Sequence, residues 1–195
     1  NFVMGDEESY GFMFGTSVRD KDAVSAVLLT LEAALHNRCK GKTLQERLRE
    51  IYHEYGWYRE TMISKYFTGQ EGVQIMAGMM ERFRANPPKK IGTRRIFQVK
   101  DYKTGYTIDP GRDCSVQDIN LPSSNVLQFF ADDGTVLSVR PSGTEPKIKF
   151  YCSVHTERGM TESDARTYLD SATKEIGDAV QQWIAEAEKS NGGNS

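Results

Sequence analysis

The apolar residues near the N-terminus follow the spacing of two helices. Between Ala23 and Leu35 they recur about every 3.6 positions over a broad face, which predicts a helix packed against other elements. Thr43 and Glu46 have the spacing of a capping box at the start of a second helix, and Gly56 is suited to end it. Two helices and a short preceding loop cannot enclose a hydrophobic core. We therefore expect the chain to begin partway through an α/β domain, with residues 1–55 as its helical end.

After Gly56 the pattern alternates between strands and helices. Stretches rich in β-branched and aromatic residues predict strands, and Asp-Asp-Gly at 132–134 predicts a hairpin turn between two of them. Two stretches with helical spacing predict helices. The expected strands are 57–67, 94–99, 126–131, 135–139 and 148–154, and the expected helices are 71–84 and 161–189. The segment 102–123 is dense in Asp, Gly and Pro, and we expect a weakly ordered loop there.

This order of elements predicts an α+β fold. In residues 56–195 a small, mostly antiparallel sheet would pack on helices and form the C-terminal domain. Residues 1–55 would be a separate unit, the helical remnant of the preceding α/β domain. No internal repeat is visible.

Composition narrows the classes of function. With 195 residues, the chain is long enough for one large or two small globular domains. No run approaches the roughly 20 apolar residues that a spanning helix needs, so we expect no membrane role. The net charge of −2 argues against nucleic acid as a main partner, because such binding needs a clustered basic surface. Cys39, Cys114 and Cys152 are widely spaced and lack histidines at ligand spacing, which indicates neither disulfides nor zinc and favours a cytoplasmic location.

The stretch from Arg140 to Lys149 has the residue types of a phosphate-binding loop. Arg140 can give two charged hydrogen bonds to one anion, and Lys149 supplies a second cation. Ser142 and Thr144 offer hydroxyl and amide donors, and Gly143 lets the backbone approach an anion closely. The alternative is an ordinary Pro/Gly turn between two strands, with Arg140 on the surface.

The sequence Arg-Pro-Ser-Gly-Thr-Glu-Pro-Lys-Ile-Lys-Phe-Tyr at 140–151 closely resembles the phosphate-binding loop in the last domain of the α-D-phosphohexomutases, the family of phosphoglucomutases and phosphomannomutases. In that family the loop holds the phosphate that is not reacting. The resemblance implies a substrate-binding role for Arg140, Ser142, Gly143, Thr144 and Lys149. Many members carry arginine where this chain has Lys149, so we expect weaker bidentate recognition at that position.

A second match lies near the N-terminus. The family's sugar-reading loop has the form Gly-Glu-x-Ser, and Glu7 and Ser9 resemble its carboxylate and hydroxyl, with Asp6 where many members have glycine. A carboxylate can accept from two adjacent sugar hydroxyls at once. Lys21 resembles the family's catalytic lysine, which can stabilise charge or assist proton transfer at the reacting phosphoryl group. Taken alone, these residues would better suit a solvated acidic turn and a charged helix start.

The resemblance covers nearly the whole chain. It assigns residues 1–55 to the end of the third phosphohexomutase domain and residues 56–195 to the C-terminal, phosphate-binding domain. The serine loop of the family, Thr-Ala-Ser-His-Asn-Pro, and its aspartate-rich magnesium loop have no counterpart in the sequence. We therefore expect no metal site here, and expect magnesium and the phosphoserine to belong to upstream domains of the same phosphoprotein.

For the complete enzyme, the resemblance implies an isomerase of carbohydrate metabolism, a phosphotransferase that moves a phosphoryl group reversibly within a sugar phosphate. A phosphoserine would donate the group, and a sugar bisphosphate would be both intermediate and activator. Glucose phosphate is favoured as substrate, with mannose and pentose phosphates as alternatives. This chain would recognise the sugar and its distal phosphate and would be inactive alone. The competing hypotheses are a free-standing phosphosugar-binding or regulatory module without catalysis, and a purely structural interaction domain.

Overall fold

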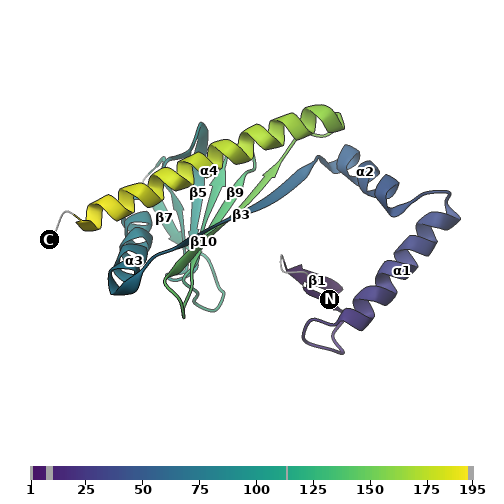
Figure 1. The fold of residues 1–195 in the computed structure, drawn as a ribbon, viewed down its shortest axis with the longest axis horizontal. Coiled ribbons are helices and arrows are strands. Elements are labelled where there is room, and N and C mark those ends of the chain that lie inside the picture. The colour runs from purple at the N-terminus through teal and green to yellow at the C-terminus, as the bar shows by residue number, and fades with distance from the viewer. Residues whose placement is uncertain (1, 8–10, 113, 193–195) are drawn as a thin grey trace. The chain divides into compact units, whose positions relative to one another are not determined.

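The computed structural model describes residues 2–7, 11–112 and 114–192. The chain divides into two compact units, Asn1–Tyr55 and Gly56–Ser195 (Figure 1). The described residues of the first unit form one hairpin and two helices: β1 (Met4–Glu7), β2 (Gly11–Phe14), α1 (Ala23–Cys39) and α2 (Leu44–Tyr55). The hairpin is antiparallel and was not anticipated, because its short strands coincide with the expected sugar-reading loop.

Local sequence signals explain where the two helices begin. The Asp22 carboxylate caps α1 by accepting from the backbone N–H groups of Val24 and Ser25. At α2 the Thr43 amide donates to the Glu46 carboxylate at 2.7 Å, and the Glu46 amide donates to the Thr43 hydroxyl at 3.1 Å. The predicted capping box is therefore confirmed.

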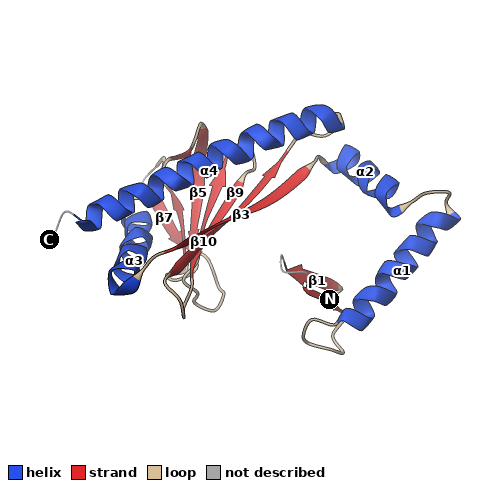
Figure 2. Cartoon of the chain, in the orientation of Figure 1, coloured by secondary structure: helices blue, strands red, loops and turns tan. Residues whose placement is uncertain are grey.

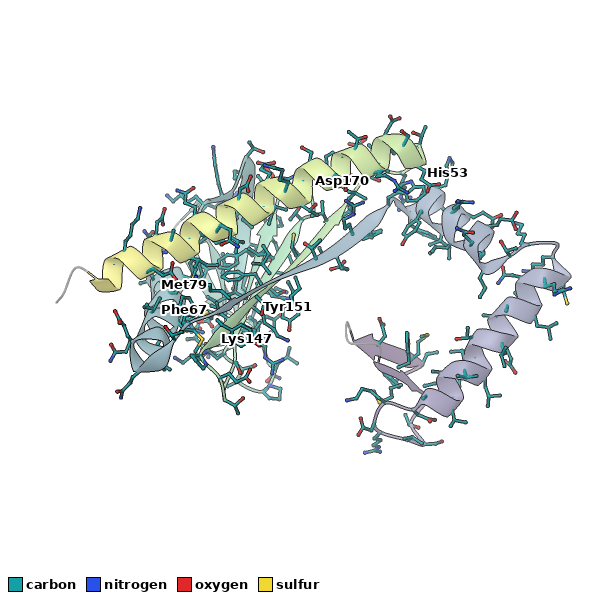
Figure 3. The ribbon with its side chains drawn as sticks, viewed as in Figure 1. His53, Phe67, Met79, Lys147, Tyr151 and Asp170 are labelled. Carbon is teal, nitrogen blue, oxygen red and sulfur yellow. The ribbon has the colours of Figure 1, made fainter. Side chains whose placement is uncertain are left out.

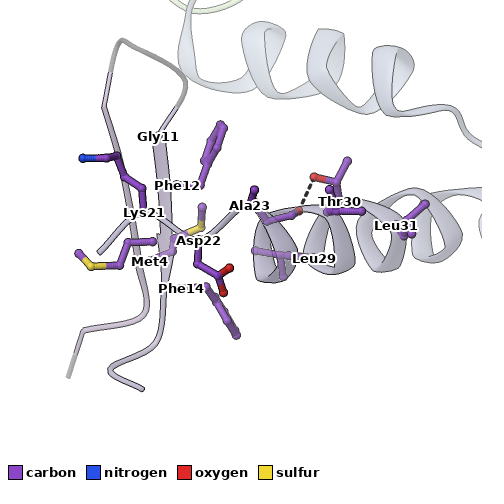
Figure 4. A pocket seen from close by; sticks show the side chains of 13 residues that line it. Met4, Gly11, Phe12, Phe14, Lys21, Asp22, Ala23, Leu29, Thr30 and Leu31 are labelled. Carbon is purple, nitrogen blue, oxygen red and sulfur yellow. Dashed lines mark hydrogen bonds between the residues drawn. The ribbon is translucent and has the colours of Figure 1, made fainter. Parts of the chain in front are cut away.

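The expectation that α1 is packed is wrong in this structure. Its apolar side chains are largely exposed, Val24 at 71% and Leu35 at 63%. The main contacts of α1 are with β2 and α2, and a two-stranded hairpin has too little surface to cover a broad helical face. Part of this face and the hairpin line a mostly apolar pocket, where the Thr30 hydroxyl donates to the Ala26 carbonyl at 2.8 Å (Figure 4).

In the second unit, residues 56–112 and 114–192 form an antiparallel sheet with two helices on it. Eight strands pair in the order β3-β10-β9-β8-β5-β6-β7, with β4 beside β5, so the sheet is larger than expected. The α+β prediction is confirmed. The elements are β3 (Tyr58–Tyr66), α3 (Gly69–Ala85), β4 (Lys90–Ile91), β5 (Arg94–Asp101), β6 (Tyr106–Asp109), β7 (Cys114–Gln117), β8 (Leu127–Ala131), β9 (Val136–Pro141), β10 (Lys147–His155) and α4 (Glu162–Gly192).

The hydrophobic core lies between one face of the sheet and the helices α3 and α4 (Figure 2). Strand β10 alternates strictly: Ile148, Phe150, Cys152 and Val154 are buried, and the residues between them are only half-buried. The methionines of α3 fill this core, as predicted. Because β10 lies inside the sheet, its alternate residues, among them Lys147 and Lys149, lie on the face opposite the core.

The segment 102–123 is not a plain loop, which corrects the expectation for it. It contains the hairpin β6–β7, in which Thr107 is opposite Val116 and Asp109 is opposite Cys114. Asp109 and Gly111 lie where the two strands meet, and the Asp109 carboxylate accepts from the Gly111 amide at 2.8 Å. The hairpin escaped prediction because all four residues of β7 are exposed and therefore show no apolar alternation.

Candidate functional site

The two principal cations of the expected phosphate site lie on strands. Arg140 belongs to β9 and Lys149 to β10, and the antiparallel register places them directly opposite each other. The same register pairs Lys149 with Ser64 on β3. The loop is therefore shorter than the sequence indicated, because pairing continues to Pro141 and Ile148. The positions of both cations are fixed by the sheet.

Hydrogen bonds within the loop fix its backbone. The Ser142 amide donates to the Lys147 carbonyl at 2.7 Å, and the Ser142 hydroxyl oxygen accepts from the amides of Thr144 and Glu145 at 3.4 and 3.3 Å. Since that oxygen accepts, its own O–H remains to donate to a ligand. The Gly143 amide and the Thr144 hydroxyl make no hydrogen bond to the described residues. These three groups are the donors that the loop itself can offer an anion.

The backbone conformation at position 143 does not require glycine. The lack of a side chain at Gly143 instead keeps the loop backbone accessible. It is not among the glycines with positive φ, and a Cβ at this position would meet nothing within 4 Å. The missing side chain leaves the backbone of the loop exposed on the open side. This geometry suits the close approach of an anion that the sequence predicted.

The loop and the strand ends line a cationic pocket of about 410 Å³. Three cations, Arg140, Lys147 and Lys149, face one carboxylate, Glu145, so the lining carries a net charge of +2. Among the described residues, none of the three cations forms an ion pair with a carboxylate. An uncompensated positive charge in a concave site attracts anions and favours a dianion.

Sequence reasoning did not include Lys147 and Tyr151, which also line this pocket. Both lie on β10 with Lys149, and Lys147 is at the end where the loop meets the strand (Figure 3). The signal was present, because residues two positions apart in a strand share a face. Placing Lys149 on an open face therefore places Lys147 and Tyr151 beside it.

The candidate residues of the first unit are only partly described. Glu7 ends β1, with its Cα opposite Gly11 of β2, and Ser9 lies outside the described residues. Lys21 lines a pocket of about 290 Å³ together with Asp6 and Arg19. The structure therefore places Lys21 against the β1–β2 hairpin, beside Asp6, which directly precedes Glu7.

Lys21 also lies next to a carboxylate. Its ammonium is 3.4 Å from Asp20 Oδ1, and its backbone N–H donates to the same oxygen at 2.7 Å. The backbone hydrogen bond, followed by the charge of Lys21, lowers the pKa of Asp20 below its usual value. Asp20 is therefore a charged neighbour of Lys21 at neutral pH.

No group of three or more His, Cys, Asp or Glu side chains is placed to hold a metal ion within 2–7, 11–112 and 114–192. In the same part of the chain, no helix has the length and apolarity needed to cross a membrane.

Comparisons with known proteins agree with the geometry. Residues 1–55 match the family profile of the phosphoglucomutase/phosphomannomutase alpha/beta/alpha domain III, and residues 94–169 match that of the C-terminal domain. The chain is 40% identical over 154 residues to a phosphoglucomutase of Staphylococcus aureus, with 79% of this chain and 28% of the relative covered. It is 38% identical over 157 residues to the phosphoglucomutase of Staphylococcus haemolyticus, covering 80% and 28%.

The fold has a counterpart among solved structures. The open form of pp63/parafusin, a phosphoglucomutase from Paramecium, matches with a TM-score of 0.53 at 20% identity, covering 89% of this chain and 30% of that chain. The chain spans less than a third of the length of these relatives. Two family profiles match in sequence order, and the phosphate-loop residues line one cationic pocket. The chain therefore belongs to the α-D-phosphohexomutase superfamily, in the region of its third and C-terminal domains.

Proposed function

We propose that this chain is the recognition part of a phosphoglucomutase- or phosphomannomutase-type enzyme, in which residues 56–195 bind the distal phosphate of the sugar phosphate. The pocket carries the proposal: three cations without ion-pair partners among the described residues surround a loop with unused donors. Arg140 would give bidentate hydrogen bonds, Lys149 would add charge from the opposite strand, and the Ser142 hydroxyl would donate.

Residues 1–55 would read the rest of the substrate. Glu7 and Ser9 would bind sugar hydroxyls, and Lys21 would act near the reacting phosphoryl group. The position of Lys21 beside Asp6 in one pocket supports this assignment. Glucose phosphate is the favoured substrate, with mannose and pentose phosphates as alternatives.

Catalysis of this kind depends on positioning. A phosphate held far from the chemistry supplies binding energy that orients the reacting end, so the anchor affects turnover as well as affinity. As the resemblance implies, we assign the magnesium site and the phosphoserine to other segments of the larger enzyme. A sugar bisphosphate would act as its activator. In the cytoplasm, the 195-residue chain would then contribute to turnover only as part of the larger enzyme.

Phosphate binding can be measured directly on the 195-residue chain. Titration with inorganic phosphate, and separately with glucose 1-phosphate, should shift the backbone amide NMR signals of residues 142–145. Association costs several kcal/mol, so we expect a Kd of about 1 mM or weaker. Arg140→Met should weaken binding at least about tenfold, because it removes charged hydrogen bonds. Arg112→Met is the matched control, since Arg112 is 84% exposed and pairs only with Asp109 among the described residues.

The competing functions give different results. Micromolar binding of glucose 1-phosphate would favour a free-standing binding or regulatory module, and no shift of the loop signals would favour a structural domain. Conversion of glucose 1-phosphate to glucose 6-phosphate by this chain alone would contradict its proposed dependence on other domains.

A further inference from the structure

Lys147 is held by one side chain of the neighbouring strand. It is the register partner of Tyr66, at the end of the β3–β10 ladder. Its ammonium nitrogen donates to the Tyr66 hydroxyl at 2.6 Å and lies 4.4 Å from the centre of the Tyr66 ring. The tyrosine thus supplies a hydrogen-bond acceptor to the cation, and its ring lies close to the same ammonium group.

The backbone around this pair is fixed on both strands. The Lys147 amide donates to the Glu145 carbonyl, and the Lys147 carbonyl accepts from the Ser142 amide, both at 2.7 Å. One residue after Tyr66, the Phe67 amide donates to the Pro146 carbonyl at 2.8 Å. Because the backbone here is already ordered, holding Lys147 in place for a ligand costs little further conformational entropy.

The ammonium of Lys147 can still donate hydrogen bonds to a ligand. It has three N–H donors, of which Tyr66 accepts one, and no carboxylate of the described residues pairs with it. The hydrogen bond to Tyr66 is the main reason that the pKa of Lys147 is raised, so the side chain is charged at neutral pH. Lys149 is held less closely, with its ammonium 5.7 Å from the ring centre of Tyr151.

We propose that Tyr66 and Lys147 are a positioning pair, in which Tyr66 holds the Lys147 ammonium at the rim of the pocket as a third cation for the bound phosphate group. This inference rests on the proposed function, because it concerns the same pocket. Neither side chain belongs to the buried core, since Tyr66 is 58% exposed and Lys147 is only half-buried. Substituting either residue should therefore leave the fold intact.

The pair can be tested by a double-mutant cycle on phosphate affinity, measured by the same amide titration. Lys147→Met should weaken the binding of inorganic phosphate about three- to tenfold, since the lost charge is partly screened by solvent. Tyr66→Phe keeps the ring, removes the acceptor, and should weaken binding about two- to threefold. In the Lys147→Met background, Tyr66→Phe should have no further effect. Lys147→Arg should restore most of the affinity because it restores the charge.

A matched control is available on the same strand. Tyr58 stacks on His155 with ring centres 5.2 Å apart, so Tyr58→Phe removes a hydroxyl from β3 without touching the pocket. Its phosphate affinity should equal that of the unchanged chain. Each variant's NMR spectrum without phosphate should match that of the unchanged chain outside the altered site, which checks that it folds.

The possible outcomes distinguish a failure of the Tyr66–Lys147 positioning role from a failure of the proposed function. If the unchanged chain binds phosphate and Arg140→Met weakens it, but Lys147→Met binds normally, the pair is overturned while the phosphate site stands. If Tyr66→Phe weakens binding equally with and without Lys147, Tyr66 acts independently and the positioning role is wrong. If neither the unchanged chain nor Arg140→Met responds to phosphate, the proposed function itself fails.

Discussion

Arg140 on β9 and Lys149 on β10 are direct cross-strand partners, two like charges placed opposite each other without an ion-pair partner among the described residues. Such a pair destabilises a sheet, by up to about 1 kcal/mol. An anion that binds between the two would relieve the repulsion. On the proposed function, the free state would carry a small energetic penalty that phosphate binding would remove.

This arrangement predicts a trade between stability and binding. Arg140→Met should leave the free energy of unfolding unchanged or raise it by about 0.5 kcal/mol in phosphate-free buffer. Phosphate at about ten times the Kd should stabilise the unchanged chain by about 1.4 kcal/mol and the variant far less. Urea unfolding with and without phosphate measures both effects. A loss above about 1 kcal/mol without phosphate would show that Arg140 supports the fold itself.

A substitution at Lys149 should increase the affinity for phosphate. Lys149→Arg should tighten phosphate binding about threefold, because a guanidinium can form two hydrogen bonds with one phosphate and an ammonium acts as a point charge. Lys149→Met should weaken binding instead. Lys100→Arg, on the same sheet but outside the pocket lining, is the control and should change nothing. Equal affinities for arginine, lysine and methionine at 149 would remove this residue from the site.

The second unit contains a buried arginine that joins three elements. Arg94 Nε donates to Asp133 at 2.7 Å and its terminal nitrogen donates to Glu175 at 2.7 Å, with only 9% of its side chain exposed. Arg94→Met should lower the free energy of unfolding by about 3 kcal/mol, since two partly buried carboxylates lose their cation. Its neighbour Arg95 is 69% exposed and lies 3.8 Å from Asp132, so Arg95→Met should cost under about 0.5 kcal/mol. Chemical unfolding of both variants decides; equal losses would contradict this role of Arg94.

Gly56 joins α2 to β3 in a conformation that excludes other residues. Its φ is +100°, and a Cβ would collide with the Thr156 carbonyl oxygen. Gly56→Ala should therefore cost about 2 kcal/mol or more. Gly69 has φ +66° but nothing within 4 Å of a Cβ, so Gly69→Ala should cost only about 1 kcal/mol. Thermal unfolding of the two variants separates the collision from the backbone strain, and equal losses would show that no collision occurs.

Cys152 should make stability fall at alkaline pH. Burial raises the pKa of its thiol to about 11 from a usual value of 9.0. Between these values the folded chain keeps a proton that the unfolded chain releases, so the free energy of unfolding falls as pH rises, by about 3 kcal/mol in total.

Removing the thiol isolates this effect from the lysines and tyrosines that titrate in the same range. The stability of Cys152→Ala should fall less steeply above pH 9 than that of the unchanged chain. Cys114→Ala is the control, since Cys114 is exposed and should leave the slope unaltered. Parallel pH profiles for all three proteins would rule out a raised pKa at Cys152.

The sequence by itself determined the features that short-range chemistry encodes. The capping box of Thr43 and Glu46, the Asp-Asp-Gly turn before β9 and the alternation of β10 each depend on residues a few positions apart. For the same reason, the composition of the phosphate loop could be recognised without knowing what surrounds it.

The tertiary structure alone decided which distant residues meet. Tyr66 is the cross-strand partner of Lys147, and Arg140 lies on a strand and not in the expected loop. Sheet order and register determine both positions. The exposure of the α1 face and the hairpin β6–β7 could likewise not be predicted from the sequence. Apolar periodicity indicates burial only where a packing partner exists. Periodicity fixes the face on which a side chain lies, but the cross-strand neighbour depends on pairing between segments far apart in the chain.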